Sequence, residues 1–76
     1  MIPMPPFRLV TAPADARVTS VRDVGARVAE GEVVAVLEAP RGRMALAAPV
    51  GGRIGGVLAG SDRSVSTGDG IVWIER

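Results

Sequence analysis

An internal repeat is the feature that most constrains how this chain can fold. Residues 12–18 (APADARV) and 48–54 (APVGGRI) share an Ala-Pro, an arginine and a β-branched residue at the same spacing. After one extra residue in the second copy, residues 28–38 align with 65–75. Half-repeats of about 12–38 and 48–75 are each too short to bury a core, so they must pack against each other. The sequence therefore predicts one domain over residues 8–76, preceded by an extension over residues 1–7.

The pattern within each copy favours strands over helices. Residues 17–22 partly alternate between polar and apolar, and residues 33–37 form a β-branched run closed by an acid. A helix over residues 14–38 is the alternative, but Gly25 and Gly31 would each cost it nearly 1 kcal/mol. The second copy carries still more glycines, and Gly-acid pairs at 31–32 and 68–69 are suited to turns. We therefore predict an all-β fold.

A tight turn joins the two copies. The stretch Ala39-Pro40-Arg41-Gly42 places proline where a type I turn needs φ near −65° and glycine at the fourth position. It predicts a hairpin with a glycine bulge, with Arg41 at the apex and pointing into solvent. Met44 follows on the emerging strand and is expected to pack.

These features together resemble the biotinyl/lipoyl attachment domain over residues 8–76. The resemblance implies a flattened β-barrel of two four-stranded antiparallel sheets with a pseudo-two-fold axis, the barrel-sandwich hybrid. It also implies that the hairpin should read Glu-Ala-Met-Lys-Met, in which the lysine carries biotin, or lipoate in related carriers. Here the Glu-Ala at 38–39 and the Ala-Pro at 48–49 match the family, but Pro40, Arg41 and Gly42 replace Met-Lys-Met.

The composition excludes the family's usual acceptor. All nine basic residues are arginine, and the 76 residues contain no lysine. A guanidinium group stays protonated and is a poor nucleophile towards an acyl-adenylate. We therefore expect neither biotin nor lipoate, and no other cofactor, with Arg41 at the position of the acceptor lysine.

Other chemistry finds little support in the sequence. Cysteine and histidine are absent, so neither a zinc site nor a base for the serines is available. Glu38 and Glu75 could be read as an acid–base pair, but we expect each to bind backbone or a nearby arginine. The stretch Gly51–Gly56 lacks the context of a phosphate loop and is expected to be a turn and then a strand whose glycines let the sheets approach. We predict a protein that is not an enzyme.

Charge and hydropathy limit the partners. A net charge of +1 and only two aromatic residues, Phe7 and Trp73, argue against nucleic acid. No signal peptide or membrane helix is evident, and the absence of cysteine suits a cytoplasmic protein. Trp73 is expected in the core with a hydrogen-bond acceptor for its N–H, and Met4 and Phe7 are expected to cover a sheet edge.

The leading functional hypothesis is an accessory or scaffold subunit that docks on a larger acyl-transfer, carboxylase or biosynthetic enzyme. The predicted contacts are one sheet face and the hairpin residues Glu38, Pro40, Arg41, Gly42, Arg43 and Met44. One alternative is a biotin or lipoyl carrier of an acyl-CoA carboxylase or a 2-oxo acid dehydrogenase complex. Another is a small protein that binds anions or acyl-CoA through the hairpin arginines. An export adaptor is disfavoured, because residues 39–48 leave no room for a helical hairpin. A homo-oligomer is possible, since short barrels expose edge strands.

Overall fold

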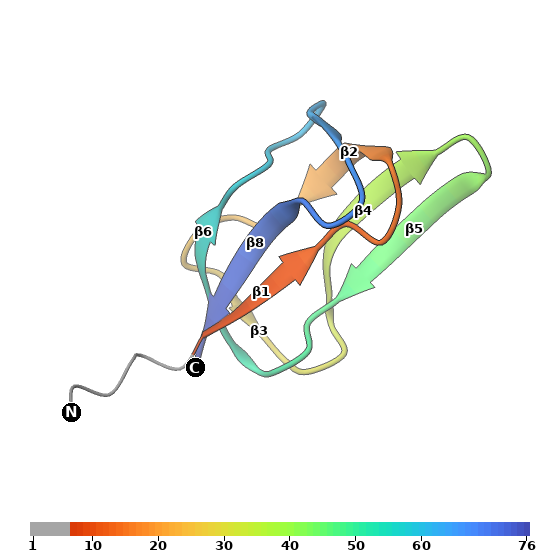
Figure 1. Ribbon diagram of the computed structural model, residues 1–76. Coiled ribbons are helices and arrows are strands. Elements are labelled where there is room, and N and C mark those ends of the chain that lie inside the picture. The colour runs from red at the N-terminus through yellow and green to blue at the C-terminus, as the bar shows by residue number, and fades with distance from the viewer. Residues whose placement is uncertain (1–6) are drawn as a thin grey trace.

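The computed structural model describes residues 7–76, and every regular element in that range is a β-strand. Figure 1 shows the arrangement. The strands are β1 (Phe7–Thr11), β2 (Ala16–Val21), β3 (Arg27–Val28), β4 (Val33–Ala39), β5 (Gly42–Ala47), β6 (Gly52–Val57), β7 (Ser64–Val65) and β8 (Gly70–Glu75). The prediction that Met4 covers a sheet edge lies outside the described residues. Over residues 7–76 there is no helix of the length and hydropathy needed to cross a membrane.

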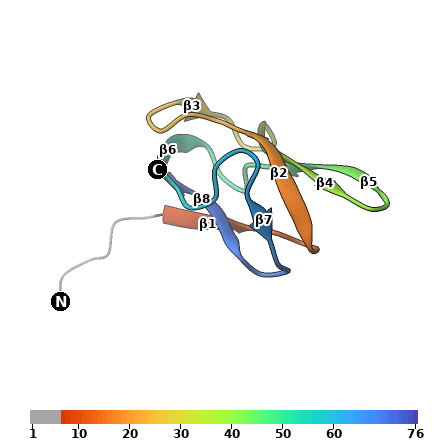
Figure 2. The ribbon, with the colours of Figure 1, turned by 90° about the horizontal axis from the view of Figure 1, so that it is seen from above.

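The strands form two antiparallel sheets of four, in the orders β1-β8-β6-β3 and β5-β4-β2-β7. The two orders correspond strand by strand: β1, β8, β6 and β3 of one sheet match β5, β4, β2 and β7 of the other, and matched strands are always four apart in chain order. The sheets are therefore related by the pseudo-two-fold that the sequence repeat predicts. The two layers enclose a flattened barrel (Figure 2). This confirms the predicted all-β fold class.

The two halves are interlocked through their loops. Ala12 accepts a hydrogen bond from Gly68 N (2.8 Å) and donates one to Asp69 O (2.9 Å). Ala48 makes the matching pair with Gly31 N and Glu32 O, at 2.8 Å each. Each Ala-Pro loop is thus fastened to the Gly-acid turn of the other half. Gly31 and Gly68 have φ of 87° and 90°, a conformation that a side chain would oppose, so these turns favour glycine.

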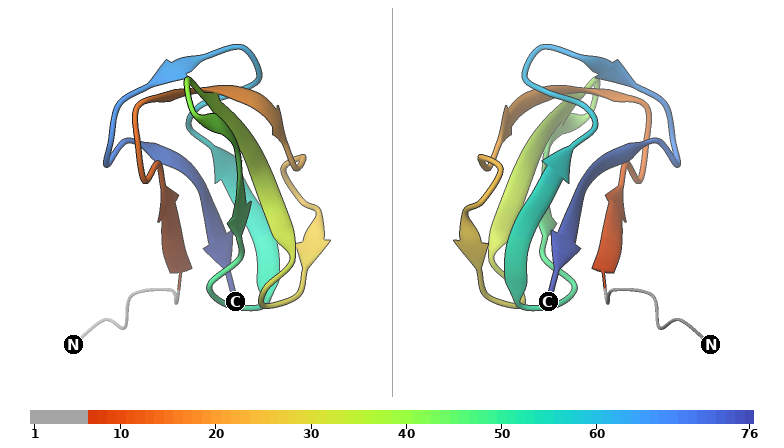
Figure 3. Two further views of the ribbon diagram at one scale, coloured as in Figure 1. Left: turned by 90° about the vertical axis from the view of Figure 1, so that its right-hand side faces the viewer. Right: turned by 90° about the vertical axis from the view of Figure 1, so that its left-hand side faces the viewer.

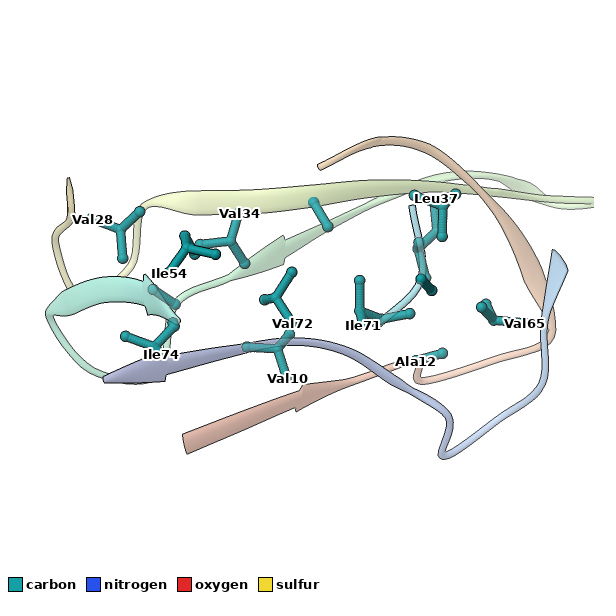
Figure 4. Close-up of a cluster of buried hydrophobic side chains, with 14 residues drawn as sticks. Val10, Ala12, Val28, Val34, Leu37, Ile54, Val65, Ile71, Val72 and Ile74 are labelled. Atoms are coloured by element: carbon teal, nitrogen blue, oxygen red, sulfur yellow. The ribbon is translucent and has the colours of Figure 1, made fainter. Parts of the chain in front are cut away.

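An apolar core lies between the two sheets (Figure 4). It is aliphatic, and its largest fully buried side chains are Leu37, Ile54, Ile71, Ile74, Val18, Val34 and Val72. Within residues 7–76 no polar or charged residue is buried. Most of these side chains occur as repeat-related pairs, for example Leu37 with Ile74 and Val18 with Ile54. Both halves therefore contribute equally to one interior.

A bulge in β8 corrects the prediction for Trp73. The register against β1 skips one residue at Ile71, so Ile71 and Val72 are both completely buried and the alternation of faces shifts. Trp73 consequently lies on the outer face and not in the core. Its indole N–H does find an acceptor, as predicted, 3.4 Å away on Glu75 Oε2.

The glycines of β6 make room for that indole. A methyl group built on Gly56 would lie only 2.0 Å from Trp73 Cη2, and one on Gly55 only 2.3 Å from Nε1. The predicted strand is confirmed over Gly52–Val57. The predicted reason was wrong, because these two glycines accept a side chain on the outer face and do not bring the two sheets together.

Candidate functional site: the hairpin between β4 and β5

The hairpin between β4 and β5 extends beyond the rest of the molecule (Figure 1). Pro40 and Arg41 form its two-residue turn, between the paired residues Ala39 and Gly42. Gly42 has a φ of 130°, which only glycine adopts without strain. The register runs without a shift from Ala39–Gly42 to the Val36–Ala45 pair, so the predicted glycine bulge is absent. Arg41 is exposed at the apex, as predicted.

The predicted contact residues do come together here. Glu38 and Arg43 are cross-strand neighbours, and Arg43 Nε lies 3.7 Å from Glu38 Oε2. Both side chains are well exposed, so this pair contributes at most about 1 kcal/mol. Met44 differs from the others: it is half-buried and packs on the core. It holds the first half of β5 against the core, while the residues from Glu38 to Arg43 form the accessible tip.

A hollow of about 350 Å³ lies beside this tip. Its surface is mainly apolar, and it is lined by Ala14, Asp15, Ala39, Pro40, Arg41, Gly42, Arg43 and Met44. Ala14 and Asp15 were not among the predicted site residues. They lie here because β2 pairs with β4, with Arg17 opposite Glu38, so the loop before β2 must adjoin the turn after β4. That pairing was the signal that could have identified them.

Asp15 fixes the loop before β2, which lines one side of the hollow. Its Oδ1 accepts hydrogen bonds from Thr67 N at 2.8 Å and from Thr67 Oγ1 at 3.1 Å. Thr67 belongs to the loop between β7 and β8, in the other half of the molecule. The hollow is therefore bounded on one side by the hairpin and on the other by a loop that both halves hold.

Glu38 and Glu75 do not form an acid–base pair. They lie near the ends of equivalent strands of different sheets, Glu38 on β4 and Glu75 on β8. Glu75 Oε1 lies 3.8 Å from Arg53 Nη2, just as Glu38 lies beside Arg43. The expectation that each glutamate meets a nearby arginine is confirmed.

Glu32 carries a perturbed carboxyl, but it serves a turn. The hydrogen bond from Ala29 N to Oε1 (3.0 Å), together with a hydrogen-bonded ion pair to Arg22, lowers the pKa of Glu32. Asp69 caps the equivalent turn of the second half by accepting from Ser66 N at 2.8 Å. The shift therefore reports a structural cap that recurs in the repeat.

The hairpin does not fit a covalently attached biotin or lipoate. Attachment of either group as an amide requires a side-chain primary amine, and the 76 residues contain no lysine. The turn offers Pro40, which has no side-chain donor, and Arg41, whose protonated guanidinium is a poor nucleophile. What the tip can do is form charge-assisted hydrogen bonds to carboxylates or phosphates.

Similarity to known proteins was found at the level of family and fold. A comparison with curated protein sequences gave no match. Among solved structures, the chain resembles part of a single-chain, multi-domain long-chain acyl-CoA carboxylase, with a TM-score of 0.88 and 30% identity. It also resembles part of the urea carboxylase of Kluyveromyces lactis, with a TM-score of 0.83 and 25% identity. These matches cover 100% and 97% of this chain but only 8% and 6% of those proteins.

A third structure shares the fold alone. It is a succinylglutamate desuccinylase/aspartoacylase from Rhodobacter sphaeroides, with a TM-score of 0.76 and 21% identity over 90% of this chain and 21% of that one. The family model described as "Biotin-requiring enzyme", the biotin/lipoyl model, matches residues 7–74. The match spans almost the whole chain and agrees with the two-sheet architecture. The protein therefore belongs to the biotin/lipoyl attachment domain family.

Proposed function

We propose that this protein is an unmodified member of the family, which docks on a larger enzyme and does not carry an acyl or carboxyl group. The observation that carries the proposal is the turn Pro40-Arg41 in a chain without lysine. We infer that Arg41 occupies the position of the acceptor lysine, since the Glu-Ala before it and the hairpin around it match the family. The fold is retained while its attachment chemistry is lost, which leaves recognition as the function of the tip.

The shape of the tip supports a role in recognition. The turn is fixed by proline, by a glycine of positive φ and by continuous strand pairing, so little entropy is lost when a partner binds. Arg41 and Arg43 present planar donors that suit carboxylates on a protein surface. The hollow beside them can take one apolar side chain of a partner. Arginine with an apolar pocket is a combination favoured at interfaces.

The comparisons support a carboxylase-like partner. The long-chain acyl-CoA carboxylase and the urea carboxylase each contain a segment of this fold within a much longer chain. We propose that the partner here is a larger enzyme of that type, in which this domain serves as an accessory or scaffold element. Docking then follows from surface complementarity at the hairpin, and no chemical step takes place on this chain.

Affinity purification from the native host, with quantitative mass spectrometry, tests the docking role. We expect a carboxylase or acyl-transfer enzyme to co-purify with the wild-type protein and to be largely lost with the double variant Arg41→Ala/Arg43→Ala. Arg63→Ala is the matched control, because Arg63 is an exposed arginine in the loop between β6 and β7. Equal recovery of such an enzyme with all three proteins, or recovery of none, would contradict the proposal.

The hollow favours one second candidate, a protein that binds acyl-CoA or another anion. Arg41 and Arg43 border a mainly apolar space of about 350 Å³, which suits a ligand with both phosphates and an apolar tail. A ligand that binds the native state raises the melting temperature by mass action. A shift with acyl-CoA that the same double variant abolishes would favour this candidate, and the absence of any shift would dismiss it.

A further inference from the structure

The pseudo-two-fold gives each outer sheet face a matched counterpart in the same molecule. Positions on the two faces correspond by an offset of 36 or 37 residues, and bulges occur at the same places: Gly55 corresponds to Thr19, and Ile71 to Val34. The backbone therefore places the same demands on both faces. Where their side chains differ in kind, the fold does not explain the difference.

The face of the first sheet carries large apolar side chains. We define the β1-β8-β6 face by Phe7, Leu9, Trp73 and Leu58; these strands lie side by side in the right-hand view of Figure 3. Leu9 is the cross-strand neighbour of Trp73. Phe7, Leu9 and Leu58 expose 47%, 48% and 52% of their surface. A methyl group built on Gly70 would lie 2.7 Å from Leu58 and 3.2 Å from Leu9, so the two leucines converge there and the patch is continuous.

The counterparts of these residues in the other sheet are small or charged. Phe7 corresponds to Arg43, Leu9 to Ala45, Trp73 to Val36 and Leu58 to Arg22. The last match follows from equivalent hydrogen bonds, in which Leu58 N donates to Ile71 O at 2.7 Å and Arg22 N donates to Val34 O at 2.8 Å. One face thus carries large apolar side chains at four positions where the other carries arginine, alanine or valine.

A basic rim borders this apolar surface. Arg27 and Arg53 are direct cross-strand partners on β3 and β6, and like charges in that relation destabilise a sheet. They line a second hollow, of about 280 Å³, together with Gly52, Glu75 and Arg76. Glu75 is the one carboxylate side chain among these lining residues, and it lies 3.8 Å from Arg53. In the other sheet the equivalent pair is Arg17 and Ser64, so two positive charges do not face each other there.

We propose that the β1-β8-β6 face is a docking surface for an acidic protein segment with large apolar side chains. The apolar side chains of the segment would cover Leu9 and Leu58, and its carboxylates would lie between Arg27 and Arg53 and relieve their repulsion. The exposed parts of the three apolar residues amount to roughly 300 Å², well below the roughly 800 Å² per partner of a standard interface. The apolar part of the contact is therefore smaller than a standard interface. This inference deepens the proposed docking role and rests on it for the existence of a partner.

The test uses a defined probe. Binding of a synthetic peptide in which leucine and glutamate alternate is followed by amide chemical shifts of the labelled protein, beside the same peptide with lysine in place of glutamate. We expect shifts in β1, β8, β6 and β3 with the glutamate peptide and none with the lysine peptide. Shifts confined to the other sheet, no shifts at all, or equal binding of both peptides would overturn the proposal.

Matched variants complete the test. Leu9→Ala introduces the residue found at the equivalent position of the other sheet, and Leu58→Gln removes a half-exposed apolar side chain without adding a charge, so the fold should tolerate both. Together they should weaken binding by about tenfold or more. Val33→Gln is the control: Val33 is 44% exposed on β4, and its variant should bind within about twofold of the wild type. An equal loss with the control would also overturn the proposal, as would self-association in sedimentation that the double variant abolishes, since the occupant would then be a second copy. These outcomes are independent of acylation, whose detection would refute only the proposed function.

Discussion

Truncation of Leu37 should bring this small domain close to unfolding. The Leu37 side chain is completely buried on β4 and belongs to the shared core. Leu37→Ala removes apolar groups worth about 2.4 kcal/mol of transfer free energy, and the residual cavity raises the loss to about 3 kcal/mol. A domain of this size, without a disulfide or a metal, has roughly 3–5 kcal/mol of net stability. The melting temperature should therefore fall by roughly 12–24 °C.

Urea and thermal denaturation, followed by far-ultraviolet circular dichroism, measure this loss. Ile74→Ala should behave alike, because Ile74 is the repeat equivalent of Leu37 and is just as buried. Val33→Ala serves as the exposed control and should cost less than about 1 kcal/mol. A loss below about 1 kcal/mol for Leu37→Ala, or a similar loss for all three variants, would refute the shared core.

Two further predictions concern turns. The fold lowers the pKa of Glu32, chiefly through the hydrogen bond from Ala29 N. The ionised carboxylate therefore stabilises the protein fully at pH values above the ordinary pKa of 4.5. This stabilisation is lost as the pH falls through the lowered pKa of the folded protein. Glu32→Gln should thus be less stable than the wild type at pH 7, and the two should converge in acid; a difference that does not change with pH, measured by urea unfolding, would refute this. Gly42→Ala should cost about 1–3 kcal/mol of stability, because φ is 130° at Gly42. Gly60→Ala is the control and should be nearly neutral, because an added methyl group meets no atom within 4 Å at either glycine and Gly60 lacks a positive φ. Equal melting temperatures of the two variants would contradict the turn geometry.

The repeat made most of the fold predictable from sequence. Its alignment placed strands at 17–22 and 33–37 with their copies in the second half, and it placed the Gly-acid turns, because side-chain period and turn chemistry are local properties. The two-residue strands β3 and β7 were not predicted individually. Strand pairing was harder to predict. β1 pairs with β8 at the other end of the chain, and the alternation of side chains along a strand does not show which strand lies beside it. Trp73 was misplaced for a related reason. A bulge shifts the alternation by one residue, and nothing in the sequence marks Ile71 as the extra one.

The candidate site also has a part that the sequence predicted and a part that it did not. The tip from Glu38 to Arg43 was predictable, because proline and glycine fix a turn wherever they occur. The hollow was not, because Asp15 reaches the hairpin only through the pairing of β2 with β4. The apolar β1-β8-β6 face was also not predicted, because the alternation of polar and apolar residues does not show which apolar side chains point outwards. Contacts between distant segments are thus the part that required coordinates.

The intact mass of the protein after co-expression with a biotin ligase and a lipoate ligase shows whether the hairpin is an attachment site. A lysine-bearing carrier domain of the family, expressed beside it, shows that both ligases are active. Arg41→Lys should fold normally and be modified only poorly, because Pro40 and Gly42 stand where the family has methionines. The wild-type protein should keep its unmodified mass under these conditions, because it has no lysine. An added biotinyl or lipoyl group on the wild-type chain would contradict this prediction.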